Sequence, residues 1–244
     1  MKIVATIEAR MASSRLPGKV LMEVDGIPML KYLIKRLKVV RSINEIVIAT
    51  TINAADDALV EFAKKEGIQY YRGSEDDVMG RVINTAESVN ADIVVEITGD
   101  CPIIDPQIVE QAIRIFLSNK ADYVSNAHVR SYPDGMDTQV FKLETLKHSY
   151  SLTDKPLDRE HVTLHIRNNP DIYTHLHLVA PPELHWPELG LTLDELNDYR
   201  LLVNIISHFS SSNPLFSCLD VIKLLRQNIK WLDINKSVIR KGDT

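Results

Sequence analysis

Short apolar segments alternate with amphipathic segments through the first half of this 244-residue chain. The apolar segments are rich in Val, Ile or Tyr, as expected of strands that are covered on both faces of a sheet. The predicted strands are residues 2–7, 45–50, 68–71, 92–97 and 122–125. Helical segments are predicted between them, at residues 28–39, 55–66, 76–89 and 106–117. This alternation predicts an α/β fold with a doubly wound, mostly parallel sheet.

The alternation breaks after residue 126. A Tyr-Pro-Asp-Gly turn signal begins at Tyr132 and starts a mixed stretch of strand and helix patterns. Strands are predicted there at 137–141 and 173–179, and helices at 144–149 and 158–167. Helices at 195–208 and 219–227 then follow. We therefore predict one domain over residues 1–244, in which an inserted α+β segment, residues 126–182, closes over the carboxyl edge of the sheet.

Composition excludes several classes of protein. The chain is 45% hydrophobic and 25% charged, with a net charge of −5, which is ordinary for a globular protein and argues against non-specific nucleic-acid binding. It shows neither a secretory leader nor an apolar run approaching about 18 residues, so we expect a cytoplasmic protein without a membrane partner. Cys101 and Cys218 stand far apart, which excludes a disulfide framework or a Cys-rich zinc site.

The loop that follows the first predicted strand concentrates cations and hydroxyl groups. Its cations are Arg10, Arg15 and Lys19, and its hydroxyl groups belong to Ser13 and Ser14. Ligands bind at the carboxyl ends of strands in open α/β sheets, and Arg and Lys side chains suit phosphate oxygens. The loop is not a Walker A sequence, but it predicts a triphosphate site.

Two acidic turns could hold a metal ion. Asp100 follows the strand at 92–97 in a Gly-Asp turn, and Asp194 stands in a second turn late in the chain. A few carboxylates combined with phosphate oxygens suit Mg²⁺. Asp100 could instead stabilise its turn. Asp194 could equally cap the helix predicted at 195–208, with Asp198 as a minor rival for the metal.

Residues 9–19 read A-R-x-x-S-x-R-L-P-G-K, which resembles the signature of the sugar-acid cytidylyltransferases. That family includes 3-deoxy-manno-octulosonate and acylneuraminate cytidylyltransferases and SpsF-like proteins of spore-coat polysaccharide synthesis. Residues 72–78 resemble its second nucleotide loop, 99–102 its metal turn and 193–195 its late acidic turn. The motifs at 132–137, 159–162 and 234–242 point to the SpsF-like branch.

The resemblance implies a fold like that of nucleotide-diphospho-sugar transferases, and transfer of CMP from CTP to a hydroxyl of a sugar acid. It implies Mg²⁺ as cofactor, held by Asp100 and Asp194, and pyrophosphate as the second product. Arg10, Lys19 and Asp100 are the implied catalytic residues. The implied nucleotide-binding residues are Ala9, Arg10, Ser13, Ser14, Arg15, Lys19, Arg72, Gly73, Ser74 and Asp100. Selection of cytosine over other bases follows from the resemblance alone.

The acceptor side is less defined. The resemblance places Asp137, Gln139, Arg159, Glu160 and His161 there. Arg159 could bind an acidic group of the acceptor, while Glu160 or His161 could bind hydroxyls or assist deprotonation. Glu160 could instead be a first-turn acid of a helix. The resemblance also implies a homodimer, with the inserted segment 126–182 as the part that binds the acceptor or mediates dimerisation. The sequence does not name the acceptor.

Three alternatives stay open. The chain could be another nucleotidyltransferase, or a glycosyltransferase of related fold. The latter normally carries an Asp-x-Asp metal motif, and the turn at 99–102 lacks the second Asp. A non-catalytic nucleotide- or sugar-binding protein is the third alternative.

Overall fold

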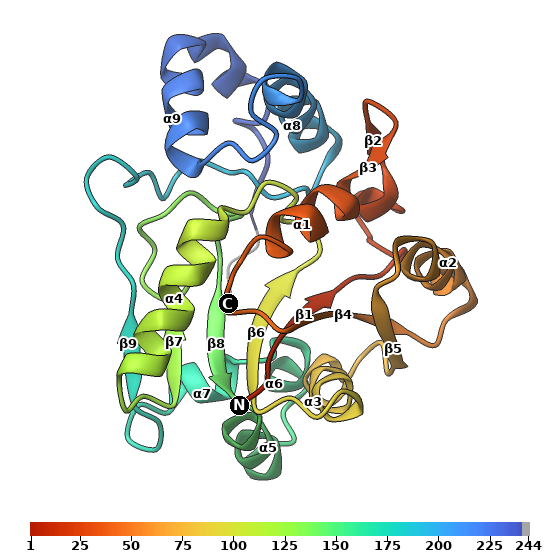
Figure 1. Cartoon of the computed structure of the whole chain (residues 1–244), viewed down its shortest axis with the longest axis vertical. Coiled ribbons are helices and arrows are strands. Elements are labelled where there is room, and N and C mark those ends of the chain that lie inside the picture. Colours follow the sequence, from red (N-terminus) through yellow and green to blue (C-terminus); the bar gives the residue numbers. More distant parts are fainter. Residues whose placement is uncertain (241–244) are drawn as a thin grey trace.

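Seven strands form one mixed sheet in the computed structural model, which describes residues 1–240 (Figure 1). The strands are β1 (Ile3–Glu8), β4 (Glu45–Thr51), β5 (Gln69–Gly73), β6 (Ile93–Thr98), β7 (Tyr123–Ser125), β8 (Gln139–Lys142) and β9 (His175–His177). Their order is β5-β4-β1-β6-β8-β7-β9. Strands β5, β4, β1 and β6 run parallel, β8 runs antiparallel to both β6 and β7, and β9 is parallel to β7. A separate hairpin consists of β2 (Glu23–Val24) and β3 (Ile27–Pro28).

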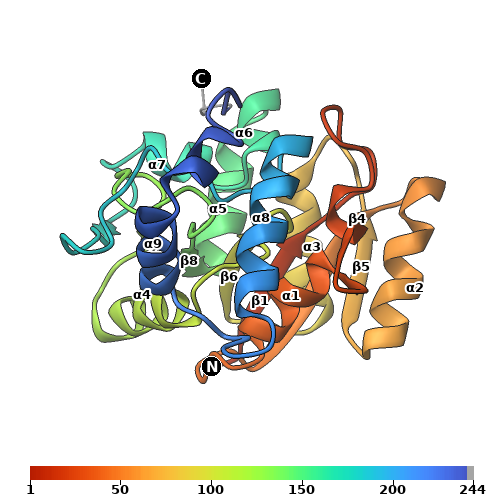
Figure 2. The same ribbon diagram turned by 90° about the horizontal axis from the view of Figure 1, so that it is seen from above.

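Helices cover both faces of this sheet. They are α1 (Met29–Leu37), α2 (Asp57–Glu66), α3 (Val78–Ser88), α4 (Pro106–Ser118), α5 (Leu143–Leu152), α6 (Pro156–Glu160), α7 (Leu164–Asn168), α8 (Leu196–Phe209) and α9 (Cys218–Gln227). The short 3₁₀ turns are η1 (Lys19–Leu21), η2 (Ala54–Asp56) and η3 (Ile229–Asp233). Apolar residues of α1, α2, α4, α8 and α9 join one core cluster, and those of α3, α5 and α7 join a second. Figure 1 shows α8 and α9 at the opposite end of the molecule from α5, α6 and α7. Strand β5 and helix α2 lie together at one edge in both views (Figure 2).

The pleat of β1 explains how a buried strand presents polar groups. Ala5 and Ile7 belong to the first core cluster and Val4 belongs to the second, so the strand is covered on both faces. Alternate residues share a face, which puts Thr6 and Glu8 on the same side as Val4. Polar side chains therefore replace the apolar ones on this face as β1 approaches its carboxyl end.

The α/β prediction with a mostly parallel sheet is confirmed. The five strands predicted in the first half coincide with β1, β4, β5, β6 and β7, with ends that differ by a few residues. The helix predicted at 28–39 ends at Leu37, and the one predicted at 55–66 starts with η2 before α2 begins.

The second half contains the larger differences. The helix predicted at 158–167 is wrong, because α6 ends at Glu160 and α7 starts at Leu164. Between them His161 leaves helical geometry, with φ −102° and ψ 88°, and the Thr163 hydroxyl donates to Gln139 Oε1 at 2.6 Å. The strand predicted at 173–179 shortens to β9, and α5 extends beyond the helix predicted at 144–149.

Within residues 126–182, β8 and β9 pair in the central sheet, while α5 and α7 contribute to its second core cluster. A role of this segment in dimerisation stays a prediction. Over residues 1–240, no helix is both long and apolar enough to cross a membrane.

Candidate active site

A cleft of about 380 Å³ opens at the carboxyl ends of β1 and β6. The loop after β1, the first turn of α3 and the residues that follow α6 form its walls. Predicted site residues that line it are Ala9, Arg10, Ser13, Ser14, Arg15, Lys19, Asp100, Glu160, His161 and Asp194. The structure therefore brings together most of the residues that the sequence motifs singled out.

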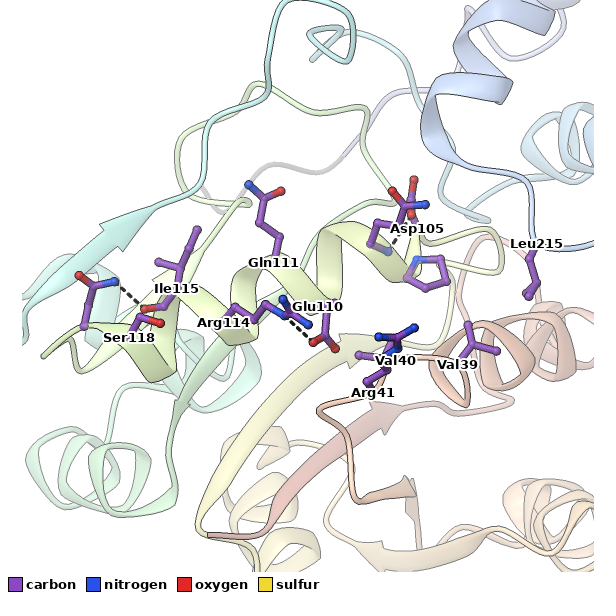
Figure 3. Close-up of a pocket in the computed structure, with 13 residues that line it drawn as sticks. Val39, Val40, Arg41, Asp105, Glu110, Gln111, Arg114, Ile115, Ser118 and Leu215 are labelled. Atoms are coloured by element: carbon purple, nitrogen blue, oxygen red, sulfur yellow. Dashed lines mark hydrogen bonds and ion pairs between the residues drawn. The ribbon is translucent and has the colours of Figure 1, made fainter.

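A larger cavity, of about 670 Å³, lies along α4 near the end of α1 (Figure 3). Its charged side chains include Glu110 and Arg114, which pair with each other at 2.8 Å. Among the residues that the structure describes, none lines both this cavity and the cleft. The smaller cleft is the candidate active site because it contains residues 9–19, the predicted phosphate-binding loop, and the two acidic turns.

A buried carboxylate, that of Asp56, accepts hydrogen bonds from the backbone of the predicted phosphate-binding loop and of β4. Asp56 is 1% exposed and accepts hydrogen bonds from the backbone N–H of Met11 at 2.7 Å and of Thr51 at 3.1 Å. Gly18 then turns the chain with φ +72°, a conformation that favours glycine, and donates its N–H to Met11 O at 2.9 Å. These contacts fix the backbone from which the Lys19 side chain extends, at the start of η1.

Lys19 joins the two acidic turns. Its Nζ lies 2.8 Å from Asp100 Oδ2 and 3.1 Å from Asp194 Oδ1. Burial lowers the pKa of Lys19, but the charges of Asp100 and Asp194 outweigh it and raise the pKa above the usual value. Burial likewise raises the pKa of Asp100, but the Lys19 charge and hydrogen bonds outweigh it and lower the pKa. Lys19 and Asp100 are therefore both charged near neutral pH.

The carboxylates of Asp100 and Asp194 suit a divalent cation, because both approach the same point, where Lys19 Nζ now lies. Among residues 1–240, no group of three or more His, Cys, Asp or Glu side chains could form a metal site by itself. A cation bound here would need oxygens from phosphate or water, which is the coordination that Mg²⁺ favours.

Asp194 is not the cap of α8. Glu195 is the N-cap, and Asp198 completes the capping box by accepting from the Glu195 N–H at 2.9 Å. The carboxylate of Asp194 instead faces cations, with Oδ1 2.7 Å from Arg15 and Oδ2 3.6 Å from Arg240. The capping interpretation is thus wrong for Asp194, and Asp198 is committed to structural contacts.

Arg10 lines the cleft and makes an ion pair with Glu75 at 2.7 Å. The side chain of Arg10 is 44% exposed, and the carboxylate of Glu75 is also partly exposed. Arg10 can therefore turn toward a ligand without leaving a buried carboxylate unpaired. Arg72 is fixed differently, because it donates to the carbonyls of Thr51 and Asn53, both at 2.8 Å, and pairs with Asp57 at 2.6 Å.

The second nucleotide loop is less directly placed. Arg72, Gly73 and Ser74 are not among the described residues that line the cleft. Gly73 packs against Arg81, whose guanidinium donates to the Ser74 carbonyl. Recognition of the base by these three residues stays a prediction.

The acceptor residues divide into two groups. A cavity of about 150 Å³ adjoins the cleft and shares Glu96, Thr98 and His161 with it. The predicted residues Asp137 and Gln139 line this second cavity. Glu160 lies on the cleft wall itself. Most of the predicted acceptor residues therefore line the cleft or the cavity next to it.

Arg159 is the exception. Its guanidinium stacks 3.2 Å from the centre of the Tyr150 ring and donates to the Tyr150 carbonyl and to Asp154, both at 3.1 Å. It lines neither of the two cavities. Arg130 and Arg167 line the smaller one instead.

Sequence reasoning missed three charged residues of the cleft. Glu8, Arg81 and Glu96 all line it, and a signal for Glu96 was present as an acid inside the apolar run of β6. Burial, and then the charge of Glu96, raise the pKa of Glu8 well above its usual value despite the opposing charge of Arg81. Neither carboxylate oxygen of Glu8 accepts a regular hydrogen bond from the described residues.

Comparison with known proteins agrees with this geometry. The family profile described as Cytidylyltransferase matches residues 4–211. The chain is 31% identical to the spore coat polysaccharide biosynthesis protein SpsF of Bacillus subtilis over 93% of this chain and 95% of that protein. It is 31% identical to 3-deoxy-manno-octulosonate cytidylyltransferase of Geobacter sulfurreducens over 62% of this chain and 61% of that enzyme.

A solved structure extends the likeness to nearly the whole chain. A cytidylyltransferase from Leptospira borgpetersenii superposes with a TM-score of 0.90 and 31% identity, over 99% of this chain and 100% of that one. The profile match, the full-length relatives and the motif-lined cleft all lead to the same assignment. The chain belongs to the cytidylyltransferase family and is a CTP-dependent nucleotidyltransferase.

Proposed function

We propose that this protein transfers CMP from CTP to a hydroxyl of a small acidic sugar, in the synthesis of a surface polysaccharide. The observation that carries the proposal is the Lys19 bridge between Asp100 and Asp194 beside the phosphate-binding loop. The SpsF and 3-deoxy-manno-octulosonate relatives support a sugar acid as the acceptor class.

The cations of the loop bind the triphosphate. Arg10, Arg15 and Lys19 line the cleft, and each can exchange its present carboxylate partner for phosphate oxygens. Mg²⁺, held by Asp100 and Asp194, would neutralise charge that develops at the α-phosphate. Positioning and charge stabilisation account for most of the rate enhancement in such a transfer.

The acceptor binds in the adjoining cavity, where Arg130 and Arg167 attract its acidic group. His161 lies where the two spaces meet and can accept the proton of the attacking hydroxyl. The acceptor oxygen forms a bond to the α-phosphorus, the bond to the bridging oxygen of pyrophosphate breaks, and the released proton passes to this base. A homodimer and a cytoplasmic location complete the proposal.

Pyrophosphate release tests this function. The protein is incubated with each of the four nucleoside triphosphates, Mg²⁺ and a panel of sugar acids, with neutral sugars as acceptor controls. We expect release only with CTP and an acidic acceptor. Asp100→Asn should lower turnover by orders of magnitude, whereas Asp171→Asn, at an exposed position outside the cleft, should retain it.

Release of a nucleoside diphosphate from a nucleotide-sugar would favour the glycosyltransferase alternative. Tight CTP binding without turnover on any acidic acceptor would favour a non-catalytic binding protein and contradict the proposal.

A further inference from the structure

The C-terminal segment returns to the active-site cleft and places Arg240 among acidic side chains. The Arg240 guanidinium donates to Asp198 Oδ1 at 2.8 Å and also to the Thr192 hydroxyl. It lies 3.6 Å from Asp134 Oδ2 and 3.6 Å from Asp194 Oδ2. One side chain from the end of the described chain therefore links the second acidic turn to the Tyr-Pro-Asp-Gly segment.

This segment is anchored at two points, one of which is a residue of the cleft wall. Asn235 is buried and donates through Nδ2 to Gly190 O at 3.0 Å and to Asp198 Oδ1 at 2.9 Å. Farther along, Ile239 O accepts a hydrogen bond from Arg15 at 3.2 Å. Residues 234–242 form one of the motifs that point to the SpsF-like branch, and Lys241 and Gly242 of that motif lie outside the described residues.

The two oxygens of Asp194 have different partners. Oδ1 faces the phosphate-binding cations, at 2.7 Å from Arg15 and 3.1 Å from Lys19. Oδ2 faces Thr192 at 3.2 Å and Arg240 at 3.6 Å. When a triphosphate draws Arg15 and Lys19 toward its own oxygens, Oδ1 becomes available while Oδ2 keeps its contacts.

We propose that Arg240 is a positioning residue, which holds Oδ2 of Asp194 so that Oδ1 faces the divalent cation. This inference rests on the proposed function, because Asp194 is a metal ligand only there. The C-terminal segment is then part of the active site, although it follows the last residue of the family profile match, residue 211.

Electrostatics supports this role. The side chains of Asp134, Asp194 and Asp198 are 15%, 13% and 1% exposed, and Arg240 lies within 4 Å of all three. Without its charge, these largely buried carboxylates would repel one another, and Asp194 would turn away from its neighbours. Residues that orient a metal ligand typically change metal affinity when they are replaced.

Gly190 makes room for this arrangement. A Cβ built on Gly190 would overlap the guanidinium of Arg240. Because Arg240 is the flexible partner, Gly190→Ala should displace its side chain and leave the backbone in place. Two independent substitutions can therefore remove the same contact, one at each partner.

Mn²⁺ binding, measured by electron paramagnetic resonance in the presence of CTP, tests the proposal. We expect Arg240→Met and Gly190→Ala each to weaken Mn²⁺ binding about tenfold or more. The double variant should be no weaker than either single variant, because both remove one interaction. Arg240→Lys should restore part of the affinity. Lys236→Ala, which removes an exposed cation of the same segment, should change it less than about twofold.

Asp194→Asn separates failure of this inference from failure of the proposed function. Weaker Mn²⁺ binding in Asp194→Asn, with unchanged binding in Arg240→Met and Gly190→Ala, would overturn the positioning role alone. Unchanged binding in Asp194→Asn would remove the metal assignment itself. Additive losses in the double variant would contradict the shared contact. Circular dichroism monitors folding, and Arg240→Lys and Gly190→Ala retain the test if Arg240→Met does not fold.

Discussion

Replacement of Lys19 by Met removes the cation that lies between the two acidic turns. Lys19, Asp100 and Asp194 are 12%, 24% and 13% exposed as side chains, so these ion pairs are largely shielded from water. Met has a similar apolar stem, which keeps the packing of η1 while it deletes both ion pairs. The substitution therefore isolates the effect of the charge.

The expected cost follows from the burial of the groups. Breaking a fully buried ion pair costs about 3–5 kcal/mol, because one charge is left uncompensated. The residual exposure, together with Arg15 and Arg240 beside Asp194, reduces this loss to about 2–3 kcal/mol. For a chain of this length, that corresponds to a decrease of about 5–10 °C in Tm.

Mg²⁺ should reverse part of this loss. In the unmodified protein Lys19 Nζ lies where the two carboxylates approach each other, so Mg²⁺ without nucleotide should change Tm little. In Lys19→Met the same oxygens are available to the cation. A concentration ten times the Kd should then stabilise the variant by about 1.4 kcal/mol.

Differential scanning fluorimetry with and without Mg²⁺, in the absence of nucleotide, measures both effects. Lys64→Met is the matched control, because Lys64 pairs with Glu61 on the exposed surface of α2 and its replacement should change Tm little. A Lys19→Met protein whose Tm fails to rise with Mg²⁺ would refute the reasoning about the metal site. An unchanged Tm without Mg²⁺ would refute the reasoning about the buried charges.

Two further predictions concern stability. Glu8→Gln should raise the free energy of unfolding, by about 1–3 kcal/mol at neutral pH, because it removes a carboxylate whose oxygens are buried without regular hydrogen bonds. Burial and Glu96 raise the folded-state pKa of Glu8 above its usual value of 4.5, so the native protein loses stability as the pH rises from 4.5 through the folded-state pKa. Tm measured from pH 4 to 8 should therefore show an advantage of Glu8→Gln that starts near pH 4.5 and grows with pH. A Tm difference that stays constant over this range would contradict the prediction. Arg36→Met should cost about 3 kcal/mol in urea unfolding, because Arg36 is 1% exposed and donates to the carbonyls of Phe216 at 2.8 Å and Ile104 at 3.3 Å. Since Arg36 lies outside the cleft, kcat should stay within about twofold, and a loss below about 1 kcal/mol would count against this role.

Local patterns in the sequence were enough to predict which residues after β1 and β6 line the cleft. The cations of residues 9–19 and the Asp100 turn follow β1 and β6, and the parallel pairing of these strands puts their carboxyl ends side by side. Neither conclusion needed a contact that depends on distant folding. The periodicity of the strands and the short motif at residues 9–19 were therefore enough to predict this part of the cleft.

The cavity that adjoins the cleft depends on contacts that no local pattern encodes. Arg159 belongs to a predicted acceptor motif, but its guanidinium stacks on Tyr150, and the arginines that line the cavity are Arg130 and Arg167. The break between α6 and α7 arises where Thr163 bonds to Gln139 of β8. Such contacts join residues that are far apart in the sequence. Helical periodicity does not detect them, and it therefore predicted one unbroken helix at 158–167.

The predicted phosphate-binding loop and the smaller cavity come from different parts of the sequence. The phosphate-binding loop follows β1, whereas the smaller cavity is built largely after β7, from residues 127–139 and 161–167. Glu96 and Thr98 of β6 form the wall that both spaces share. Substitutions in the later stretch can therefore reshape the smaller cavity while the loop after β1 stays intact. Under the proposed function, a duplicated gene with this topology could keep its donor nucleotide and diverge in its acceptor.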